Sequence, residues 1–114
     1  MKKFKMLILL ISIIGCNNDR IKANFYEIKD GIARFDIVNG SAKDIEEFTF
    51  EIKYLDKSNT VLLLDTISYG VNKEFSDEPF FLKSNASTFI VQSIPKKCES
   101  ADIKILKIVY LENK

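Results

Sequence analysis

The sequence predicts an all-β domain, a sandwich of about seven antiparallel strands in two sheets, after an N-terminal signal segment. Apolar and polar residues alternate with a period of two residues in several segments of the chain. Turn-forming residues separate these segments at regular intervals, and no segment of the domain shows the 3.6-residue apolar repeat of a helix. Because each half-buried strand has one apolar face, two sheets are expected to close over a shared core.

The alternation is clearest in residues 48–54, where apolar residues occupy the even positions and polar residues the odd ones. Residues 33–37 repeat this pattern on odd positions, and residues 89–91 and 103–111 are apolar runs rich in β-branched residues. In the last run the apolar phase shifts near Leu106, which predicts a β-bulge. The predicted strands are 24–29, 31–39, 46–56, 60–68, 79–82, 86–94 and 102–111.

Gly, Asn, Asp and Ser residues between these segments favour turns. The side chains that follow the apolar phase of each strand are expected to meet in the core. They are Phe35, Ile37, Phe48, Phe50, Ile52, Tyr54, Phe89 and Val91.

Residues 1–15 have the layout of a secretory signal peptide. Lys2, Lys3 and Lys5 precede an apolar run over residues 6–14, and no acidic residue interrupts it. The run is roughly half the length of about 20 residues that a membrane-spanning helix needs. It therefore predicts a signal for export.

The end of this run resembles a bacterial lipobox, Ile13-Ile14-Gly15-Cys16. In such precursors the thiol of the cysteine is alkylated with a diacylglycerol, and the signal is then cut just before it. The resemblance implies lipidation at Cys16, a tether over residues 16–23 and a β-sandwich domain over 24–114. The protein would be lipid-anchored in the cell envelope, on the extracytoplasmic side of a membrane.

Three other interpretations of the N-terminal segment stay open: an ordinary cleaved signal, an uncleaved anchor, and a buried strand or helix over residues 4–14. A core segment would not explain the three lysines before it, nor the polar residues 17–19 directly after it. These features favour the lipoprotein.

A mature chain that starts at Cys16 has 14 basic and 16 acidic residues, and hence a net charge of −2. No basic face is evident, so nucleic acid is not an expected partner. With Cys16 lipidated, Cys98 has no partner for an intrachain disulfide. Its place after Lys96 and Lys97 leaves three options: an idle, half-buried thiol, an exposed and activated one, or an intermolecular disulfide.

Residues 35–45 and 48–56 together resemble the FxLYD-type, immunoglobulin-like domains of bacterial exported proteins and lipoproteins. In these domains one strand ends in Asn-x-Ser, as in Asn39-Gly40-Ser41, and a later strand ends in an aromatic-aliphatic-Asp turn, as in Tyr54-Leu55-Asp56. Residues 80–89 are similar to their turn before the penultimate strand.

The resemblance covers about residues 24–111 and implies a seven-stranded, immunoglobulin-like sandwich without catalytic residues. The chain departs from the family where Lys57-Ser58-Asn59 replaces a turn that usually contains glycine. Asn59 is expected to adopt the left-handed conformation in its place. Such a fold resemblance does not transfer a function.

Candidate residues for chemistry are few. The sequence contains no histidine, which removes Ser-His and Cys-His nucleophile pairs and histidine-containing zinc sites. Its four glycines form no phosphate-binding loop. The acidic residues lack the spacing of a calcium loop and are interpreted as solvated charges; they are Asp44, Glu46, Glu47, Asp77 and Glu78. We therefore expect no enzymatic activity, no cofactor and no metal.

Two consecutive apolar runs suggest an interaction surface. Neighbouring residues of a strand point to opposite faces, so a two-layer sandwich cannot bury both sets. Leu62 and Leu64 are expected on one face, and Val61 and Leu63 on the other. Either the chain itself or a protein partner covers the outer residues. The candidate surface comprises Val61, Leu62, Leu63, Leu64, Phe80 and Phe81.

These features favour a membrane-anchored binding or accessory module of the cell envelope. The alternative is a structural component of an envelope assembly that self-associates. A divergent enzyme domain is a third and weaker interpretation.

Overall fold

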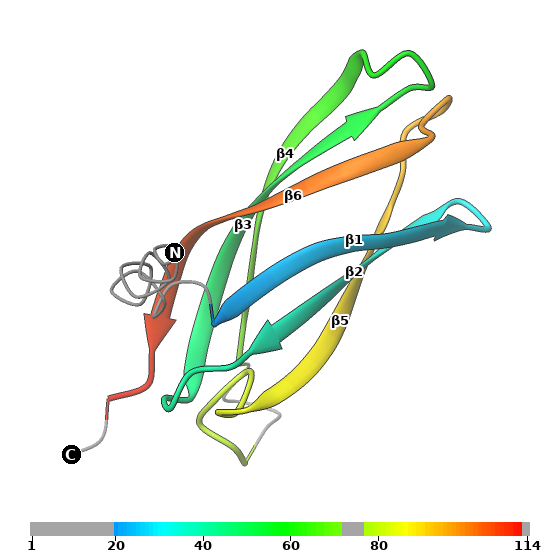
Figure 1. Cartoon of the computed structure of the whole chain (residues 1–114). Helices are drawn as coiled ribbons and strands as arrows, with labels where there is room; N and C mark the ends of the chain where they lie inside the picture. The colour runs from blue at the N-terminus through cyan, green and yellow to red at the C-terminus, as the bar shows by residue number, and fades with distance from the viewer. Residues whose placement is uncertain (1–19, 72–76, 113–114) are drawn as a thin grey trace, which may run out of the picture.

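The domain consists of six strands in two antiparallel three-stranded sheets, as the computed structural model shows for residues 20–71 and 77–112. Sheet A has the order β1-β2-β5 and sheet B the order β4-β3-β6. The two sheets pack face to face as a sandwich (Figure 1). The strands are β1 (Ile21–Lys29), β2 (Ile32–Asn39), β3 (Ile45–Leu55), β4 (Val61–Gly70), β5 (Ala86–Ser93) and β6 (Ser100–Tyr110). The predicted signal segment and Cys16 lie outside the described residues.

The core lies between the central strands β2 and β3. Alternate residues of each strand are buried, and the rest face outward. Each fully buried side chain of this size contributes about 1.5–3 kcal/mol to folding. The prediction of inward-facing side chains is confirmed for Phe35, Ile37, Phe48, Phe50, Ile52 and Tyr54.

The prediction that Phe89 and Val91 face the core is wrong. Their side chains are 53% and 47% exposed, whereas Ile90 between them is buried. In the pairing of β2 with β5, Ile90 lies opposite the buried Phe35 and therefore shares its face. Three apolar residues in a row fit either phase of a strand, and the pairing with β2 decides which one is inside.

The predicted seventh strand, over residues 79–82, is not a strand. Leu82 forms only an isolated bridge with Ile45, and the backbone N–H groups of Phe81 and Leu82 both donate to the Ile45 carbonyl. The segment begins with Pro79, which has no N–H group for a ladder. At the same end of the sandwich, β1 starts at Ile21, opposite Asn39, so residues 21–23 belong to the strand and not to a tether.

Two finer predictions are confirmed. The register of β6 against β3 shifts between Lys107 and Ile105, so Leu106 is the extra residue of a β-bulge. Asn59 has a φ of 66° in the β3–β4 turn, which is the left-handed conformation.

Candidate functional site

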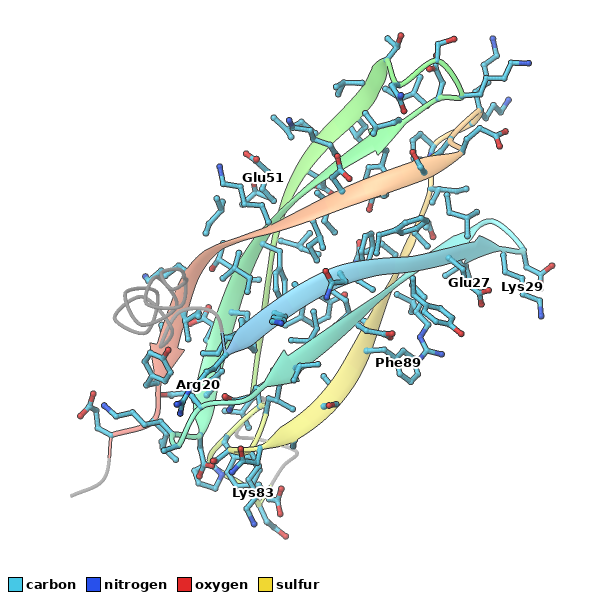
Figure 2. All side chains as sticks on the ribbon, in the orientation of Figure 1. Arg20, Glu27, Lys29, Glu51, Lys83 and Phe89 are labelled. Atoms are coloured by element: carbon cyan, nitrogen blue, oxygen red, sulfur yellow. The ribbon has the colours of Figure 1, made fainter. Side chains whose placement is uncertain are left out.

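The outer face of sheet A carries the largest set of exposed apolar side chains. Inner and outer residues alternate along β2, so the outer residues form rows with their partners on β1 and β5. Phe89, labelled in Figure 2, projects from this face. The outer face of sheet A is defined here by Tyr26, Ile32, Arg34, Asp36, Val38, Phe89 and Val91.

Arg34 is at the centre of this face. Its Nε donates a hydrogen bond to Asp36 Oδ1 at 2.9 Å. Its guanidinium carbon lies 4.6 Å from the ring centroid of Tyr26 and 4.4 Å from that of Phe89. Both distances are within the range of a cation–π interaction. We call Tyr26, Arg34, Asp36 and Phe89 the Arg34 cluster.

The backbone explains why these four side chains meet. Asp36 is opposite Phe89 in the register of β2 with β5, and Arg34 is two residues away on the same face of β2. On the other side of β2, the register of β1 shifts between Phe25 and Glu27, which makes Tyr26 the bulged residue. A bulge changes the direction of its side chain, and here it brings the Tyr26 ring against Arg34.

The geometry leaves part of Arg34 available to a partner. Among the described residues, none accepts a hydrogen bond from its two terminal nitrogens. Because two rings and a carboxylate already hold the side chain, little conformational entropy remains to be lost on binding. Arginine, tyrosine and other aromatic residues are enriched in the cores of protein–protein interfaces. The arrangement is suited to docking a protein surface.

The sequence contains a signal for this face that the prediction missed. The alternation of residues 33–37 predicts that the odd positions face inward, so Ile32 and Val38 belong to the outer face, and both are apolar and exposed. The aromatic partners of Arg34 carried no such signal. Tyr26 depends on a bulge, and Phe89 was assigned to the wrong face.

The predicted surface on the two apolar runs is divided between opposite ends of the sandwich. Val61 pairs with Leu55 near the β3–β4 turn. Phe81 lies near Ile45 at the other end of β3, where its ring packs against Phe48 and Tyr69. Phe80 is half-buried at that same end. The structure therefore does not bring the two runs together.

The first run keeps an exposed apolar surface of its own. Strict alternation fails here, because a bulge at Leu62 interrupts the pairing of β4 with β3. Leu62 packs against the core, while Val61, Leu63 and Leu64 are 51%, 45% and 54% exposed. By the register with β3, Leu64 lies opposite Lys53 on the outer face, whereas Leu63 lies opposite the buried Tyr54 and so on the inner face.

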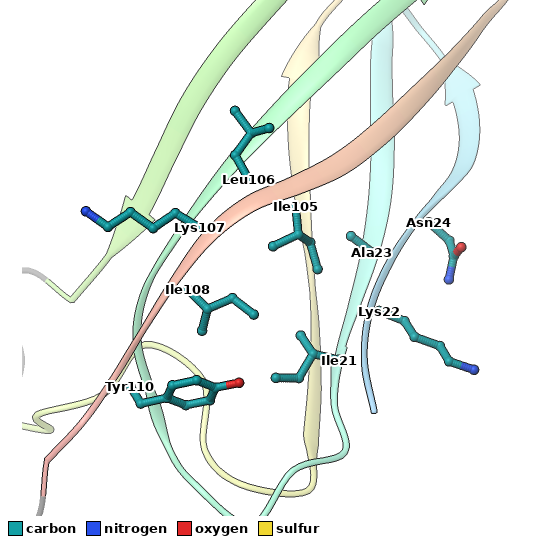
Figure 3. A pocket seen from close by; sticks show the side chains of 9 residues that line it. All are labelled: Ile21, Lys22, Ala23, Asn24, Ile105, Leu106, Lys107, Ile108 and Tyr110. Atoms are coloured by element: carbon teal, nitrogen blue, oxygen red, sulfur yellow. The ribbon is translucent and has the colours of Figure 1, made fainter. Parts of the chain in front are cut away.

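A groove of about 600 Å³ lies between the edge strands β1 and β6. Figure 3 shows Ile105, Ile108 and Tyr110 pointing toward Ile21, while the charged ends of the lining lysines point away. A ligand site normally adds a few converging polar groups to an apolar pocket, which fix the orientation of the ligand. In Figure 3 the Tyr110 hydroxyl also points toward Ile21, and one such side-chain group does not make a converging set. The groove is described here as the seam between the edge strands β1 and β6.

The described residues contain no grouping of three or more Cys, Asp or Glu side chains that would hold a metal ion. Asp44 accepts a hydrogen bond from the Ser84 N–H at 2.8 Å, so its carboxylate fastens a loop. Cys98 is buried and its Sγ donates to the Ser100 carbonyl, which corresponds to the idle thiol. No helix that is long and apolar enough to cross a membrane occurs in residues 20–71 or 77–112.

Comparison with known proteins identified no matching family model, no similar curated protein and no similar solved structure.

Proposed function

We propose that the protein is a lipid-anchored, non-enzymatic binding module of a bacterial cell envelope, and that the outer face of sheet A docks a protein partner. The anchor rests on the N-terminal layout of three lysines, a short apolar run and Cys16. The docking surface rests on the Arg34 cluster and the apolar residues around it.

We also propose that the domain is a divergent FxLYD-type, immunoglobulin-like sandwich. The strand orders β1-β2-β5 and β4-β3-β6 support this, because they correspond to strands A-B-E and C′-C-F of that fold. The motif residues have the expected local roles. Asn39 bonds Ser41 within the first turn, and Asp56 accepts hydrogen bonds from the N–H groups of Ser58 and Thr60 in the second.

The observation that carries the docking proposal is the contrast between the two outer faces. On the outer face of sheet B, Glu51 of β3 lies opposite Lys104 of β6. Lys53 of β3 lies opposite Asp102 of β6. On sheet A, five large apolar or aromatic side chains are exposed around one held arginine. Exposed apolar area of this kind on one face typically marks an interaction site.

The test uses the full chain with a C-terminal tag, chemically cross-linked in cells and recovered from solubilised membranes. We expect it to capture a distinct protein. Val38→Glu places a charge on the face, and Arg34→Ala removes the centre of the cluster. Each should lower the recovery of that protein roughly tenfold or more, which corresponds to about 1.4 kcal/mol of binding free energy.

The matched control is Thr66→Glu, a charge on an exposed position of sheet B. It should leave recovery unchanged. Equal losses in Val38→Glu and Thr66→Glu, or no captured protein at all, would contradict docking through sheet A. Loss of capture only with Leu64→Glu would move the site to the outer face of sheet B at the start of β4.

A further inference from the structure

The four edge strands of the sandwich differ in how well they are protected against pairing with another strand. Edge strands of natural sheets typically carry bulges, charges or inward-pointing charged residues that prevent such pairing. β1 has a bulge at Tyr26, and β6 has one at Leu106. These two edges also lie beside each other. β4 has a bulge at Leu62, and its Asp65 is opposite the buried Ile52 and so shares the inner face.

β5 has none of these features. It pairs with β2 over all eight residues without a register shift, and its sequence, ASTFIVQS, contains no charged residue, no proline and no glycine. Within the described residues, β2 is its only strand partner. Phe89 and Val91 stand exposed beside its free edge.

The direction of the backbone groups follows from two contacts. The Ile94 N–H donates to the Gly31 carbonyl on the β2 side, whereas the Val91 carbonyl accepts a bond from the Tyr69 hydroxyl on the opposite side. The backbone N–H and C=O groups of successive residues in a strand point to opposite sides. The backbone groups of Ser87, Phe89 and Val91 therefore point to the free edge of β5. Tyr69 already occupies the edge at Val91, which leaves Phe89 as the centre of an available segment.

We propose that this edge pairs with the β5 edge of a second copy of the chain, antiparallel and about a two-fold axis at Phe89. Sheet A would then continue through two copies as one six-stranded sheet. The inference is independent of the lipid anchor and of the distinct partner proposed above.

The charge pattern fits a second copy. A two-fold axis brings each residue near its own equivalent, so a charged edge would repel itself, and an uncharged one does not. The Arg34 side chains of the two copies would be separated by three strand spacings, about 14 Å. This distance exceeds the Debye length of about 8 Å at physiological salt.

The Phe89 side chain is both held in place and exposed, as pairing with a second copy requires. Arg34 holds one face of its ring at 4.4 Å, while 53% of the residue stays exposed. In the proposed register the Phe89 side chains of the two copies are direct neighbours on the outer face. Aromatic pairs across antiparallel strands are among the stabilising pairs of sheets.

The expected association is weak. Because Tyr69 occupies the edge at Val91, the available residues 86–90 extend over about 17 Å. A sheet with its side chains is about 10 Å thick, which gives roughly 170 Å² per copy. Stable dimers bury about 1,200 Å² or more in total. The pair is therefore to be sought in full chains at their concentration in the cell rather than in dilute solution.

The test co-expresses two full-length chains with different tags, recovers one after cross-linking in cells and measures the other. We expect the parent chain to capture itself. Phe89→Lys in both chains, or Phe89→Glu in both, should reduce this capture roughly tenfold, because like charges then meet at the axis. One Phe89→Lys chain with one Phe89→Glu chain should restore it.

The control is Val38→Glu, which changes the outer face on the central strand and leaves the β5 edge intact. It should preserve self-capture even where it abolishes capture of a distinct protein. The inference is overturned if the parent does not capture itself, if the mixed charges do not restore capture, or if Val38→Glu is as damaging as Phe89→Lys. Circular dichroism of each variant, showing a retained β spectrum, separates these outcomes from unfolding.

Discussion

Asn39 shows how one side chain holds three segments together. It is fully buried, and its Nδ2 lies 2.9 Å from the Lys43 carbonyl, 3.3 Å from that of Leu82 and 3.2 Å from that of Lys83. Its Oδ1 accepts hydrogen bonds from the backbone N–H and the hydroxyl of Ser41. The residue therefore joins the end of β2 to the β2–β3 loop and to the segment before β5.

We predict that Asn39→Ala lowers the free energy of unfolding by about 3 kcal/mol, because it removes several hydrogen bonds and leaves buried carbonyls without a donor. Urea denaturation of the domain that starts at residue 20 measures the change. Asn24→Ala, the same substitution at an exposed position of β1, should stay within about 0.5 kcal/mol. Similar losses in both variants would contradict a central role for Asn39.

Tyr54 is a second buried residue with a polar group, but it differs from Asn39 in its hydrogen bonding. Its side chain is buried, and its hydroxyl has no hydrogen-bond partner among the described residues. Burial, with smaller contributions from Asp65, Cys98 and Tyr69, raises the pKa of Tyr54 from 10.0 to about 12. Because the folded state holds the phenolic proton more tightly than the unfolded chain, the contribution of Tyr54 to stability should be constant below about pH 10 and fall between pH 10 and pH 12.

We predict that this alkaline loss is on the order of 2 kcal/mol and that Tyr54→Phe abolishes it. At neutral pH the same variant should be about 1 kcal/mol more stable than the parent, because it removes a buried hydroxyl without a partner. Chemical denaturation at pH 8 and pH 11.5 measures both effects. Tyr26→Phe, at an exposed tyrosine, is the control, and a destabilised Tyr54→Phe would indicate a bond to water or to residues outside the described part.

At the level of strands, the inner and outer faces could be predicted only where apolar and polar residues alternate without interruption. β2 and residues 48–54 of β3 alternate strictly, so the predicted faces of these residues are correct. The 89–91 run contains three apolar residues, so its phase depends on the register with β2. Residues 79–82 resemble a strand locally, but a strand also requires partners, and within residues 20–71 and 77–112 this segment has a bridge to Ile45 alone.

The contacts within the Arg34 cluster could not be predicted from the sequence, because they too depend on strand register. The cluster depends on the registers of three strands and on a bulge in one of them. The run at the start of β4 was recognised as surplus apolar surface, but the bulge at Leu62 changed which of its members are exposed.

The assignment of faces predicts opposite outcomes for two phenylalanines. Phe50→Ala should cost about 3–5 kcal/mol of stability, because the side chain is fully buried and leaves a cavity. Phe89→Ala should cost about 1 kcal/mol or less, since it mainly loses the contact with Arg34. Urea midpoints of the two variants provide the comparison. A large loss for Phe89→Ala would return this residue to the core.

At the level of the whole molecule, the proposed anchor makes a direct prediction. Mass spectrometry of the membrane fraction should find an acylated N-terminal peptide that begins at Cys16, and Cys16→Ser should abolish the modification. Cys98→Ser is the matched control and should remain in the membrane fraction, because that thiol is buried in the domain. A mature chain that retains Met1 would rule the anchor out.

The early start of β1 determines how such an anchored domain would stand. Only four residues separate Cys16 from Ile21, so Ile21 would lie within about 18 Å of the lipid attachment point. Figure 1 shows the start of β1 at the same end as the last residues of β6, and the β3–β4 turn at the other end. A fluorophore at Ser41 should therefore be quenched by labelled lipid headgroups more strongly than one at Asn59. In this orientation the long axis of the sandwich rises from the bilayer, and sheet A turns sideways, toward neighbours that diffuse in the same leaflet.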